Sequence, residues 1–391
     1  MRKFRILLPY LGRWDQPSRS RFHQIAERLA RNGCIVHVIQ APPLESEEII
    51  FQQRNIELHQ NIKLHTIELN RRIWSHARLG KILRKGYYGL AVTQMVKRLI
   101  REFSIDVLWL YNLPHYPLSK IRNCIIIFDY ADDYISMLKT EVKFLNNTIT
   151  ELIARAFLKG LLRRSDIIFC VSKILYDHVG ALVGEGKSLI LPNGVDLDVF
   201  SFPDSDHSDL GSIPQEKATI GFVGAFEYFI NFDMIFEAAR RLPKVQFLLV
   251  GAGRQYEYLR KVKECEKLNN IHFTGFVGNE EVPQYISRMD VCLNSFKRTR
   301  VSHAACSMKL FEYLALGKPV ITSTLEEVTN IDEGFLYYAD TPEQLVGQIE
   351  WILEHYKEAL EKTCKVKPII TQRYNWDIIA GRFVNAIEEC L

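Results

Sequence analysis

Lys309 and Glu312 stand three residues apart in the segment SMKLFEYLALGKPVITS, residues 307–323. In a helix this spacing places both side chains on one face, near the helix N-terminus. An ammonium group there can bind a diphosphate, and a carboxylate one turn further can accept two hydrogen bonds from ribose hydroxyls. An ordinary ion pair on a helix surface has the same spacing, so the two residues alone leave both interpretations open.

Three turns marked by glycine precede this segment, and each is expected directly after a strand. They are GFVGAF at 221–226, LLVGAG at 248–253 and FTGFVG at 273–278. A residue without a side chain lets backbone N–H groups approach an anion, and a following helix adds the positive end of its dipole. One such turn is often only a tight turn, but the ordered series is more specific than any of its members.

An acidic cluster follows another expected strand in IIIFDYADDY, residues 125–134. Asp129, Asp132 and Asp133 would lie at the carboxyl end of this strand, where ligands of α/β sheets bind. Carboxylates this close raise one another's pKa values, which suits a general base. The alternative is a helix cap or a solvated turn, because aspartate is also favoured there.

The loop after the first strand, in PYLGRWDQPSRSRFHQ, concentrates Arg13, Trp14, Asp15 and Arg19. We expect such a loop to bind a sugar ring or an acceptor phosphate by stacking and charge pairing. His115, in YNLPHYP after another strand, is a further candidate for contact with an acceptor. The alternatives are a packed tryptophan with surface arginines, and a structural histidine.

Alternating strands and helices must position these residues. Short apolar runs that fit strands are 3–9, 35–40, 107–110, 124–129, 167–172, 188–192, 218–223, 245–250, 271–274, 291–294 and 319–322. Runs with helical spacing are 20–32, 231–242, 256–267, 280–288 and 308–316. Strands this uniformly apolar suit parallel sheets that are covered by helices on both faces.

A polar, turn-rich segment at 202–215 is typical of a linker between domains. We therefore expect an α/β protein with two Rossmann-like domains, at 1–201 and 216–375, that face a central cleft. The remaining segment, 376–391, is expected to be a helix that packs back on the N-terminal domain.

The bulk composition excludes several classes of protein. With 391 residues, 47% of them hydrophobic and 25% charged, the chain fits two ordinary soluble domains. Its net charge of +4 is too small to indicate a partner nucleic acid. The eight cysteines are scattered without a C-x-x-C pair, which argues against a disulfide framework or a zinc site. No uncharged apolar stretch reaches about 18 residues, so we expect a cytoplasmic protein.

The segment 71–101 contains lysine and arginine but no acidic residue, and aromatic and aliphatic residues alternate with the charges. This composition suits peripheral docking to an anionic membrane surface. An ordinary core helix with a basic solvated face is the alternative.

The series of motifs resembles that of the GT-B glycosyltransferases, particularly the family 4-like group that makes bacterial cell-envelope and exopolysaccharide glycans. LPNGVDLDVF at 191–200 is similar to the end of the N-terminal domain in that group, and KLFEYLALGKPVI at 309–321 follows the three glycine turns in the group's order. The resemblance implies a transferase of the hexosyltransferase type with a C-terminal nucleotide-sugar-binding domain and an N-terminal acceptor-binding domain. The implied donor is a nucleotide sugar, with UDP favoured, and the implied acceptor is a glycan or a lipid-linked sugar. No cofactor or metal is expected.

The same resemblance implies roles for individual residues. Glu312 would bind the donor ribose, Lys309 the diphosphate, and Gly224 would let the loop backbone come near the phosphates. Further implied donor-site residues are Phe276 and Val277 beside the base, and Ser307 and Met308 beside the diphosphate and sugar. Because the chain lacks an arginine and a lysine that the group usually carries, other cations must meet the phosphate charge, and Lys297, Arg298 and Arg300 are available in addition to Lys309.

Two departures from the group's pattern bear on the mechanism. Retaining members usually carry an acidic residue where this chain has Ala304, and an arginine and a lysine where it has FEYFINFD at 226–233. The SMKL start of the helix at 307–310 is similar to that of the inverting glucuronosyltransferases of xanthan assembly, whose base aspartate aligns best with Asp132. We therefore expect inversion, with Asp132 or one of its acidic neighbours as the base. A retaining transferase, a nucleotide-sugar epimerase or hydrolase, and a non-catalytic nucleotide-sugar-binding or scaffold protein are the alternatives.

Overall fold

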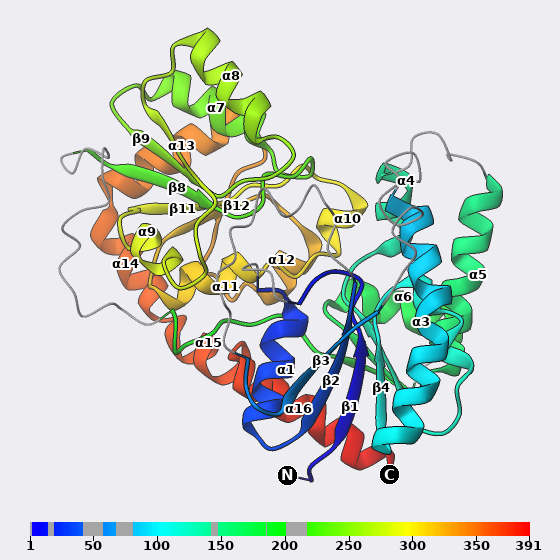
Figure 1. The fold of residues 1–391 in the computed structure, drawn as a ribbon. Helices are drawn as coiled ribbons and strands as arrows, with labels where there is room; N and C mark the ends of the chain where they lie inside the picture. Colours follow the sequence, from blue (N-terminus) through cyan, green and yellow to red (C-terminus); the bar gives the residue numbers. More distant parts are fainter. Residues whose placement is uncertain are drawn as a thin grey trace. The chain divides into compact units, whose positions relative to one another are not determined.

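The structure is a computed structural model, drawn in Figure 1. It describes residues 2–14, 19–41, 58–67, 81–141, 148–184, 186–200 and 217–391, with their side chains except those of 81–90 and 139–141. The chain divides into two compact units, one formed by 1–192 with 376–391 and the other by 193–375. The expected linker at 202–215 lies outside the described residues, and residues 193–200 belong to the second unit rather than the first.

The first unit is built on a seven-stranded parallel sheet with the strand order β3-β2-β1-β4-β5-β6-β7. Its inner strands are mostly apolar and buried, because helices cover both faces of the sheet. The order reverses between β1 and β4, which places the carboxyl ends of these two strands at a topological switch point. The strands are β1 (Arg5–Pro9), β2 (Ile35–Gln40), β3 (Ile62–Thr66), β4 (Val107–Leu110), β5 (Ile125–Tyr130), β6 (Ile167–Cys170) and β7 (Ser188–Ile190).

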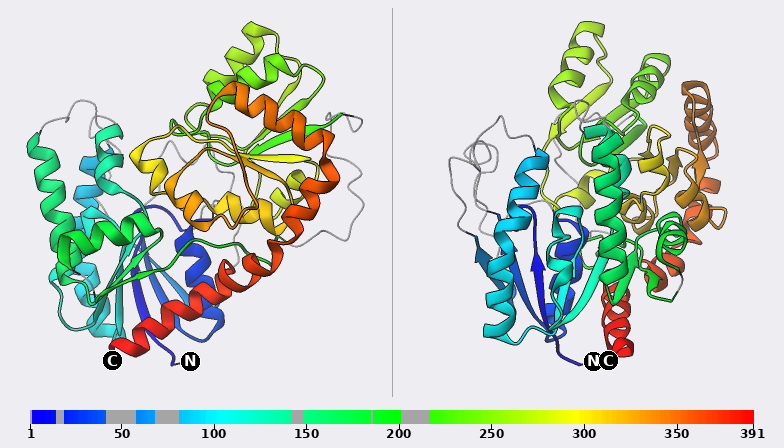
Figure 2. Two further views of the ribbon diagram at one scale, coloured as in Figure 1. Left: turned by 180° about the vertical axis from the view of Figure 1, so that it is seen from behind. Right: turned by 90° about the vertical axis from the view of Figure 1, so that its right-hand side faces the viewer.

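Helices α1 and α16 pack together on one face of this sheet, and α3 and α5 lie on the other (Figures 1 and 2). Helix α16 comes from the far end of the chain, and its Phe383 ring lies 4.9 Å from the ring of Trp109 and 4.8 Å from that of Phe169. The helices are α1 (Arg21–Arg31), α3 (Lys81–Phe103), α4 (Tyr134–Glu141), α5 (Thr148–Arg164), α6 (Lys173–Val183) and α16 (Trp376–Cys390), with short 3-10 turns η1 (Leu113–His115) and η2 (Leu118–Lys120).

The second unit is built on a six-stranded parallel sheet with the order β10-β9-β8-β11-β12-β13. The order again reverses next to the first strand of the unit, here between β8 and β11. The strands are β8 (Thr219–Val223), β9 (Gln246–Val250), β10 (Ile271–Gly275), β11 (Val291–Asn294), β12 (Val320–Thr322) and β13 (Tyr337–Tyr338). The helices are α7 (Phe232–Arg241), α8 (Tyr256–Glu266), α9 (Val282–Ser287), α10 (Arg300–His303), α11 (Met308–Ala315), α12 (Glu326–Ile331), α13 (Pro342–Glu354), α14 (Tyr356–Cys364) and α15 (Lys367–Arg373).

Both units are therefore parallel α/β sheets of the Rossmann type, and the predicted fold class is confirmed. In both, the residues singled out from the sequence follow the carboxyl ends of strands near the reversal in strand order. This is the edge at which open α/β sheets bind ligands.

Candidate functional site

The glycine turns of the second unit are held together through their backbones. Gly224, after β8, has a φ of +145°, and its N–H donates to the carbonyl of Val250 at 3.0 Å. Gly251, after β9, has a φ of +131°, and its N–H donates to the carbonyl of Gly275 at 2.9 Å. A Cβ atom on Gly251 would lie 2.1 Å from the carbonyl oxygen of Gly224. Only glycine at 251 allows the first two loops to approach this closely.

The ammonium group of Lys309 lies against the first of these loops. A Cβ atom on Gly224 would lie 2.9 Å from Lys309 Nζ, so any larger residue there would displace the lysine. The same Nζ lies 4.5 Å from the centre of the Phe222 ring and 5.1 Å from that of Phe296. Two aromatic faces attract the cation but give it no hydrogen-bond acceptor. Its hydrogen-bonding capacity therefore stays open for an anion beside Gly224.

Glu312 lies one turn after Lys309 on α11. Both side chains are half-buried. Burial raises the pKa of Glu312 to about 7, against the attraction of Lys309, which lowers it. Burial likewise lowers the pKa of Lys309 to about 8, against the attraction of Glu312. Within the described residues neither charged group forms a hydrogen bond or an ion pair with the protein, so both remain available to a ligand.

Two polar contacts that the sequence did not reveal fix helix α11 to the sheet. The hydroxyl of Tyr313 accepts a hydrogen bond of 2.8 Å from the backbone N–H of Val223, at the last residue of β8. At the start of the helix, the Ser307 hydroxyl donates to Oδ1 of Asn294 at 3.0 Å. The Asn294 amide in turn donates to the Thr322 hydroxyl at 3.0 Å. The only sequence signal was a polar residue that ends each of two apolar strands, VCLN and VIT.

The other donor-site candidates have varied environments. The Phe276 ring follows β10 and is 51% exposed, and Val277 beside it is half-buried. Met308 is half-buried at the first position of α11. Lys297 Nζ lies 3.3 Å from a carboxylate oxygen of Asp233, and Arg300 begins α10. Lys297 therefore already has an acidic partner, unlike Lys309.

In the first unit the three aspartates of the acidic cluster have different environments. Asp129 is fully buried, and its carboxylate accepts from Arg21 Nε at 3.0 and 3.1 Å and from Trp109 Nε1 at 3.3 Å. Burial raises the pKa of Asp129, and the Arg21 charge opposes that shift. A carboxylate enclosed in this way cannot reach an acceptor hydroxyl, which argues against Asp129 as the base.

Asp133 is also buried, and it forms a helix cap. Its carboxylate accepts from the Ser136 backbone N–H at 3.1 Å and from the Ser136 hydroxyl at 2.6 Å, at the start of α4. The capping interpretation therefore holds for Asp133, which argues against a role in catalysis. Asp132 alone of the three is exposed, just after the carboxyl end of β5.

The candidates for acceptor contact are largely packed inside the first unit. Trp14 is 1% exposed, and its ring stacks on His23 with 4.0 Å between ring centres. This burial argues against the stacking of a sugar on Trp14. His115 is fully buried, accepts from the Tyr111 backbone N–H at 3.2 Å, and has a pKa lowered to about 3 by burial. The structural interpretation therefore holds for His115.

The structure describes two of the three charged candidates in the loop after β1. Arg19 forms an ion pair with Glu27 on α1, and Arg13 is half-buried. Asp15 lies outside the described residues. Arg13 and Arg19 are therefore the candidates of this loop whose side chains still reach the surface.

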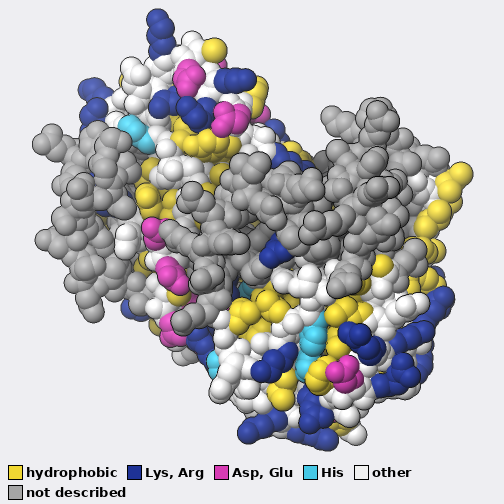
Figure 3. All heavy atoms as spheres, viewed as in Figure 1, with side chains coloured by type: hydrophobic (Ala, Val, Ile, Leu, Met, Phe, Trp, Pro, Cys, Tyr) yellow, Lys and Arg dark blue, Asp and Glu magenta, His cyan; other side chains and the backbone are white. Residues whose placement is uncertain are grey.

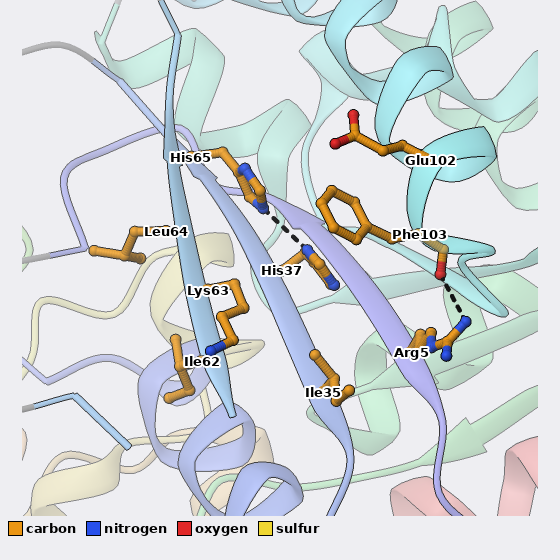
Figure 4. A pocket seen from close by; sticks show the side chains of 9 residues that line it. All are labelled: Arg5, Ile35, His37, Ile62, Lys63, Leu64, His65, Glu102 and Phe103. Carbon is orange, nitrogen blue, oxygen red and sulfur yellow. Dashed lines mark hydrogen bonds between the residues drawn. The ribbon is translucent and has the colours of Figure 1, made fainter. Parts of the chain in front are cut away.

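A hollow of about 560 Å³ on the first unit was not foreseen from the sequence (Figure 4). Within it, His37 Nδ1 lies 2.9 Å from His65 Nε2, and burial lowers the pKa of His37 to about 4. Arg5 and Ile35, which begin β1 and β2, lie at its lower end in the figure, away from the carboxyl ends of the strands. The hollow therefore does not belong to the site expected at the carboxyl edge. Its lining residues are Arg5, Ile35, His37, Ile62, Lys63, Leu64, His65, Glu102 and Phe103.

The described residues contain neither a metal-binding cluster nor a membrane-spanning helix. No group of three or more histidine, cysteine, aspartate or glutamate side chains in that part of the chain could hold a metal ion. None of its helices combines the length and the apolar character needed to span a bilayer. Of the basic segment 71–101, residues 71–80 lie outside the described part, and the rest forms most of helix α3.

Comparison with known families and proteins agrees with this geometry. Residues 217–355 match the family model "Glycosyl transferases group 1", and residues 20–199 match the model "Glycosyltransferase Family 4". The chain is 27% identical over 362 residues to TuaH of Bacillus subtilis (strain 168), named as a glycosyltransferase of teichuronic acid biosynthesis. That match covers 87% of this chain and 87% of TuaH.

Solved structures of glycosyltransferases share the fold over nearly the whole chain. Sucrose-phosphate synthase from Thermosynechococcus elongatus superposes with a TM-score of 0.76 at 16% identity and covers 99% of both chains. Anabaena HepE, solved in complex with UDP-glucose, has a TM-score of 0.70 at 16% identity, covering 99% of this chain and 100% of its own. WaaG, a glycosyltransferase of lipopolysaccharide biosynthesis, has a TM-score of 0.72 at 15% identity, covering 98% and 99%. With a glycosyltransferase family model matched in each half and this architecture throughout, the chain is a glycosyltransferase with the GT-B fold.

Proposed function

We propose that this enzyme transfers a sugar from a nucleoside diphosphate, with UDP favoured, to a lipid-linked or polysaccharide acceptor of the cell envelope. The observation that carries the donor assignment is the pair Lys309 and Glu312. The Lys309 ammonium group lies beside Gly224, and within the described residues neither charged end has a hydrogen bond or an ion pair. An ammonium group at that loop matches a diphosphate, and a carboxylate one turn further matches the two hydroxyls of a ribose. HepE, whose structure contains UDP-glucose, and TuaH, named for teichuronic acid biosynthesis, support the choice of UDP and of an envelope glycan.

The proposed reaction inverts the configuration at the anomeric carbon. An acceptor hydroxyl attacks that carbon and gives its proton to Asp132, while the bond between the carbon and the diphosphate oxygen breaks. The negative charge that develops on the leaving diphosphate is met by Lys309 and by the N-terminus of α11, without a metal ion. Ala304 supports inversion, because it is a 2% exposed apolar residue at the position where the retaining group carries a carboxylate.

The localisation belongs to the same proposal. An envelope acceptor attached to a lipid and a nucleotide-sugar donor meet at the inner face of the plasma membrane, so we place the enzyme in the cytoplasm, peripheral to that membrane. Extraction of a membrane fraction with high salt, followed by detection of the enzyme, tests this placement. An enzyme found only in the soluble fraction at low salt would contradict it.

Isothermal titration with UDP-, GDP- and dTDP-sugars tests the donor assignment. Replacement of Glu312 by glutamine should weaken binding of the preferred nucleotide sugar about tenfold or more, because a charged acceptor for two ribose hydroxyls is lost. The control is Glu326→Gln, a solvent-facing glutamate of the same unit on α12. Equal affinities of the wild type and Glu312→Gln would overturn the donor assignment.

Replacement of Asp132 by asparagine tests the base. The turnover rate should fall by about 10²- to 10⁴-fold while donor affinity stays unchanged, because the proton acceptor is lost and the donor contacts remain. The control is Asp133→Asn, which removes a buried carboxylate of the same loop that caps α4. Wild-type turnover in Asp132→Asn would refute the role of this residue, and a product with retained anomeric configuration in NMR spectra would refute inversion.

A further inference from the structure

Helix α5 presents an apolar stripe to solvent. Ile149, Leu152 and Ile153 are 62%, 60% and 50% exposed, and Phe157 is 37% exposed. Their spacing of three, one and four residues places them along one side of the helix. Scattered apolar residues are normal on a protein surface, but a contiguous stripe marks an interaction site. Figure 3 shows hydrophobic side chains along the edge of the molecule where α5 lies, with lysine and arginine side chains close by.

The stripe is not needed to attach α5 to the first unit, because the opposite side of the helix does that. Ala154, Leu158, Leu161 and Leu162 on that side are at most 6% exposed. An ordinary surface helix has one apolar face toward the core and a polar face toward water. The second apolar face of α5 therefore exposes hydrophobic area to solvent, although its Phe157 also stacks on Tyr116 of the same unit.

Basic side chains surround the outer stripe. The helix contains four basic residues and a single acidic one, Glu151, whose Oε1 lies 2.6 Å from Arg155 Nη2. After that pair is formed, Lys159, Arg163 and Arg164 leave the C-terminal half of the helix positively charged. An apolar face with flanking lysine and arginine is the composition of a helix that lies in a membrane interface.

An aromatic cluster completes the edge of the stripe. The Tyr116 ring stacks on Phe157 with 4.5 Å between ring centres and 9° between ring planes. Tyr116 fits beside Gly160, where a Cβ atom would lie 2.4 Å from its ring. The Arg164 guanidinium lies 5.2 Å from the centre of the Tyr116 ring, and Lys120 Nζ lies 5.5 Å from it. Tyrosine together with long basic side chains is enriched where a protein meets lipid headgroups.

We propose that the outer face of α5 inserts into an anionic lipid surface, with Ile149, Leu152, Ile153 and Phe157 among the acyl chains and the basic residues at the headgroups. This contact lies outside the basic segment 71–101 and requires neither the donor site nor a particular acceptor. A second copy of the chain is a poorer occupant, because a symmetric contact through α5 would bring the basic residues of both copies together. Lipid phosphates neutralise the same charges.

Flotation with vesicles of phosphatidylcholine, with and without phosphatidylglycerol, tests the proposal on the full chain. The double variant Leu152→Gln with Ile153→Gln removes apolar area while it keeps helix propensity. It should lower the partition coefficient on anionic vesicles at least about tenfold. The double variant Lys159→Gln with Arg163→Gln should remove the preference for phosphatidylglycerol and the salt dependence of binding. The control variant, Tyr258→Gln with Ile378→Gln, changes two side chains of other helices that are 62% and 44% exposed, and it should bind as the wild type does.

Two further measurements, of thermal stability and of UDP affinity, separate loss of lipid binding from other causes. The thermal midpoint and the affinity for UDP should match the wild type in every variant, which separates loss of lipid binding from misfolding and from failure of the donor assignment. Anionic vesicles that bind the first variant as strongly as the wild type would overturn the proposal. So would a wild type that ignores vesicles but forms a dimer in sedimentation velocity that this variant abolishes, because the partner would then be a second copy.

Discussion

A cation and a carboxylate are paired in each unit, Arg21 with Asp129 in the first and Lys309 with Glu312 in the second, and the two pairs are built in opposite ways. In the first unit Arg21 and Asp129 contact each other directly at 3.0 Å, and the carboxylate also accepts from Trp109. In the second unit Lys309 and Glu312 share a helix face, but within the described residues their charged ends make no hydrogen bond or ion pair. The first pair is satisfied by the protein, whereas the second keeps both charges available.

The difference separates a structural role from a ligand-binding role. A buried ion pair with direct hydrogen bonds compensates its own desolvation, so removal of one partner leaves an uncompensated charge. Partly buried charges that lack a partner are unfavourable in the free protein, and they are satisfied only when a ligand of complementary charge binds. The shifted pKa values of Lys309 and Glu312, about 8 and about 7, are the sign of this unfavourable state.

The largest expected effect is on stability, from the satisfied pair. Asp129→Ala should lower the free energy of unfolding of the first unit by about 3–5 kcal/mol, because it leaves the Arg21 charge buried without its carboxylate. Urea unfolding followed by tryptophan fluorescence measures this loss, since Trp14, Trp109 and Trp376 all belong to that unit. The exposed pair Lys173–Asp177 supplies the control: Asp177→Ala should cost less than about 1 kcal/mol. Similar losses in the two variants would remove the distinction between the pairs.

The unsatisfied pair should respond in affinity rather than in stability. Lys309→Met should weaken binding of UDP-glucose by about tenfold to 100-fold, because a charged hydrogen bond to the diphosphate is worth about 1.5–3 kcal/mol. Its unfolding free energy should stay constant or rise, since an unfavourable buried charge is removed. Titration calorimetry and urea unfolding on the same sample measure both quantities, and Lys263→Met on α8 is the control. A large loss of stability with unchanged affinity would make Lys309 a structural residue.

The pH dependence of donor binding should follow the two shifted groups. As the pH falls below about 7, Glu312 gains a proton and loses its capacity to accept two ribose hydrogen bonds, so affinity falls. As the pH rises above about 8, Lys309 loses its proton and its attraction for the diphosphate, so affinity falls again. Each limb should approach about tenfold per pH unit. Titrations with UDP-glucose over a range of pH measure the affinity. The fall in affinity at acidic pH should vanish in Glu312→Gln, and the fall at alkaline pH should vanish in Lys309→Met. A fall that persists in the corresponding variant would be due to another group.

The smallest effect is expected from the contact that holds α11 against β8. Tyr313→Phe keeps the ring but leaves the Val223 backbone N–H without its acceptor, which should lower the stability of the second unit by about 1 kcal/mol. Because the helix that carries both charges is then held less firmly, UDP-glucose affinity should fall by less than about tenfold. Calorimetry on this variant, with Tyr258→Phe as the control, measures the change. An effect as large as that of Lys309→Met would place Tyr313 in contact with the ligand.

Much of the architecture followed from patterns in the sequence. The strand at 107–110 and that at 291–294 have the predicted bounds, because the short apolar runs VLWL and VCL, each preceded by an aspartate, fit a short buried strand. Helix α11 ends at Ala315, one residue before the predicted end at 316. The strand at 62–66 was missed because IKLHT alternates charged and apolar residues at an edge of the sheet, where only half of its positions are covered. The long helix α3 was expected only as the alternative interpretation of the basic segment 71–101, because its charges obscure the apolar period.

For the candidate site, the sequence predicted the surroundings of some residues but not those of others. Lys309, Glu312 and Gly224 lie together, because all three depend on local features: a helix spacing and a turn after a strand. The burial of Trp14, His115 and Asp129 depends on contacts between residues far apart in sequence, such as that between Arg21 and Asp129, and no local pattern contains those contacts. Composition cannot separate a capping aspartate from an exposed one either, so Asp132 and Asp133 look alike until Ser136 is placed.

Helix α16 gives the first unit an unusual dependence on chain order. Trp376 and Phe383 are fully buried in a unit whose other elements all precede residue 193, so the second unit is synthesised before the first can be completed. During translation the first sheet therefore remains incompletely packed, with the surface around Trp109 and Phe169 uncovered, until α16 has been synthesised. A nascent chain stalled between the two units would be a target for chaperones, although each of its strands was already made.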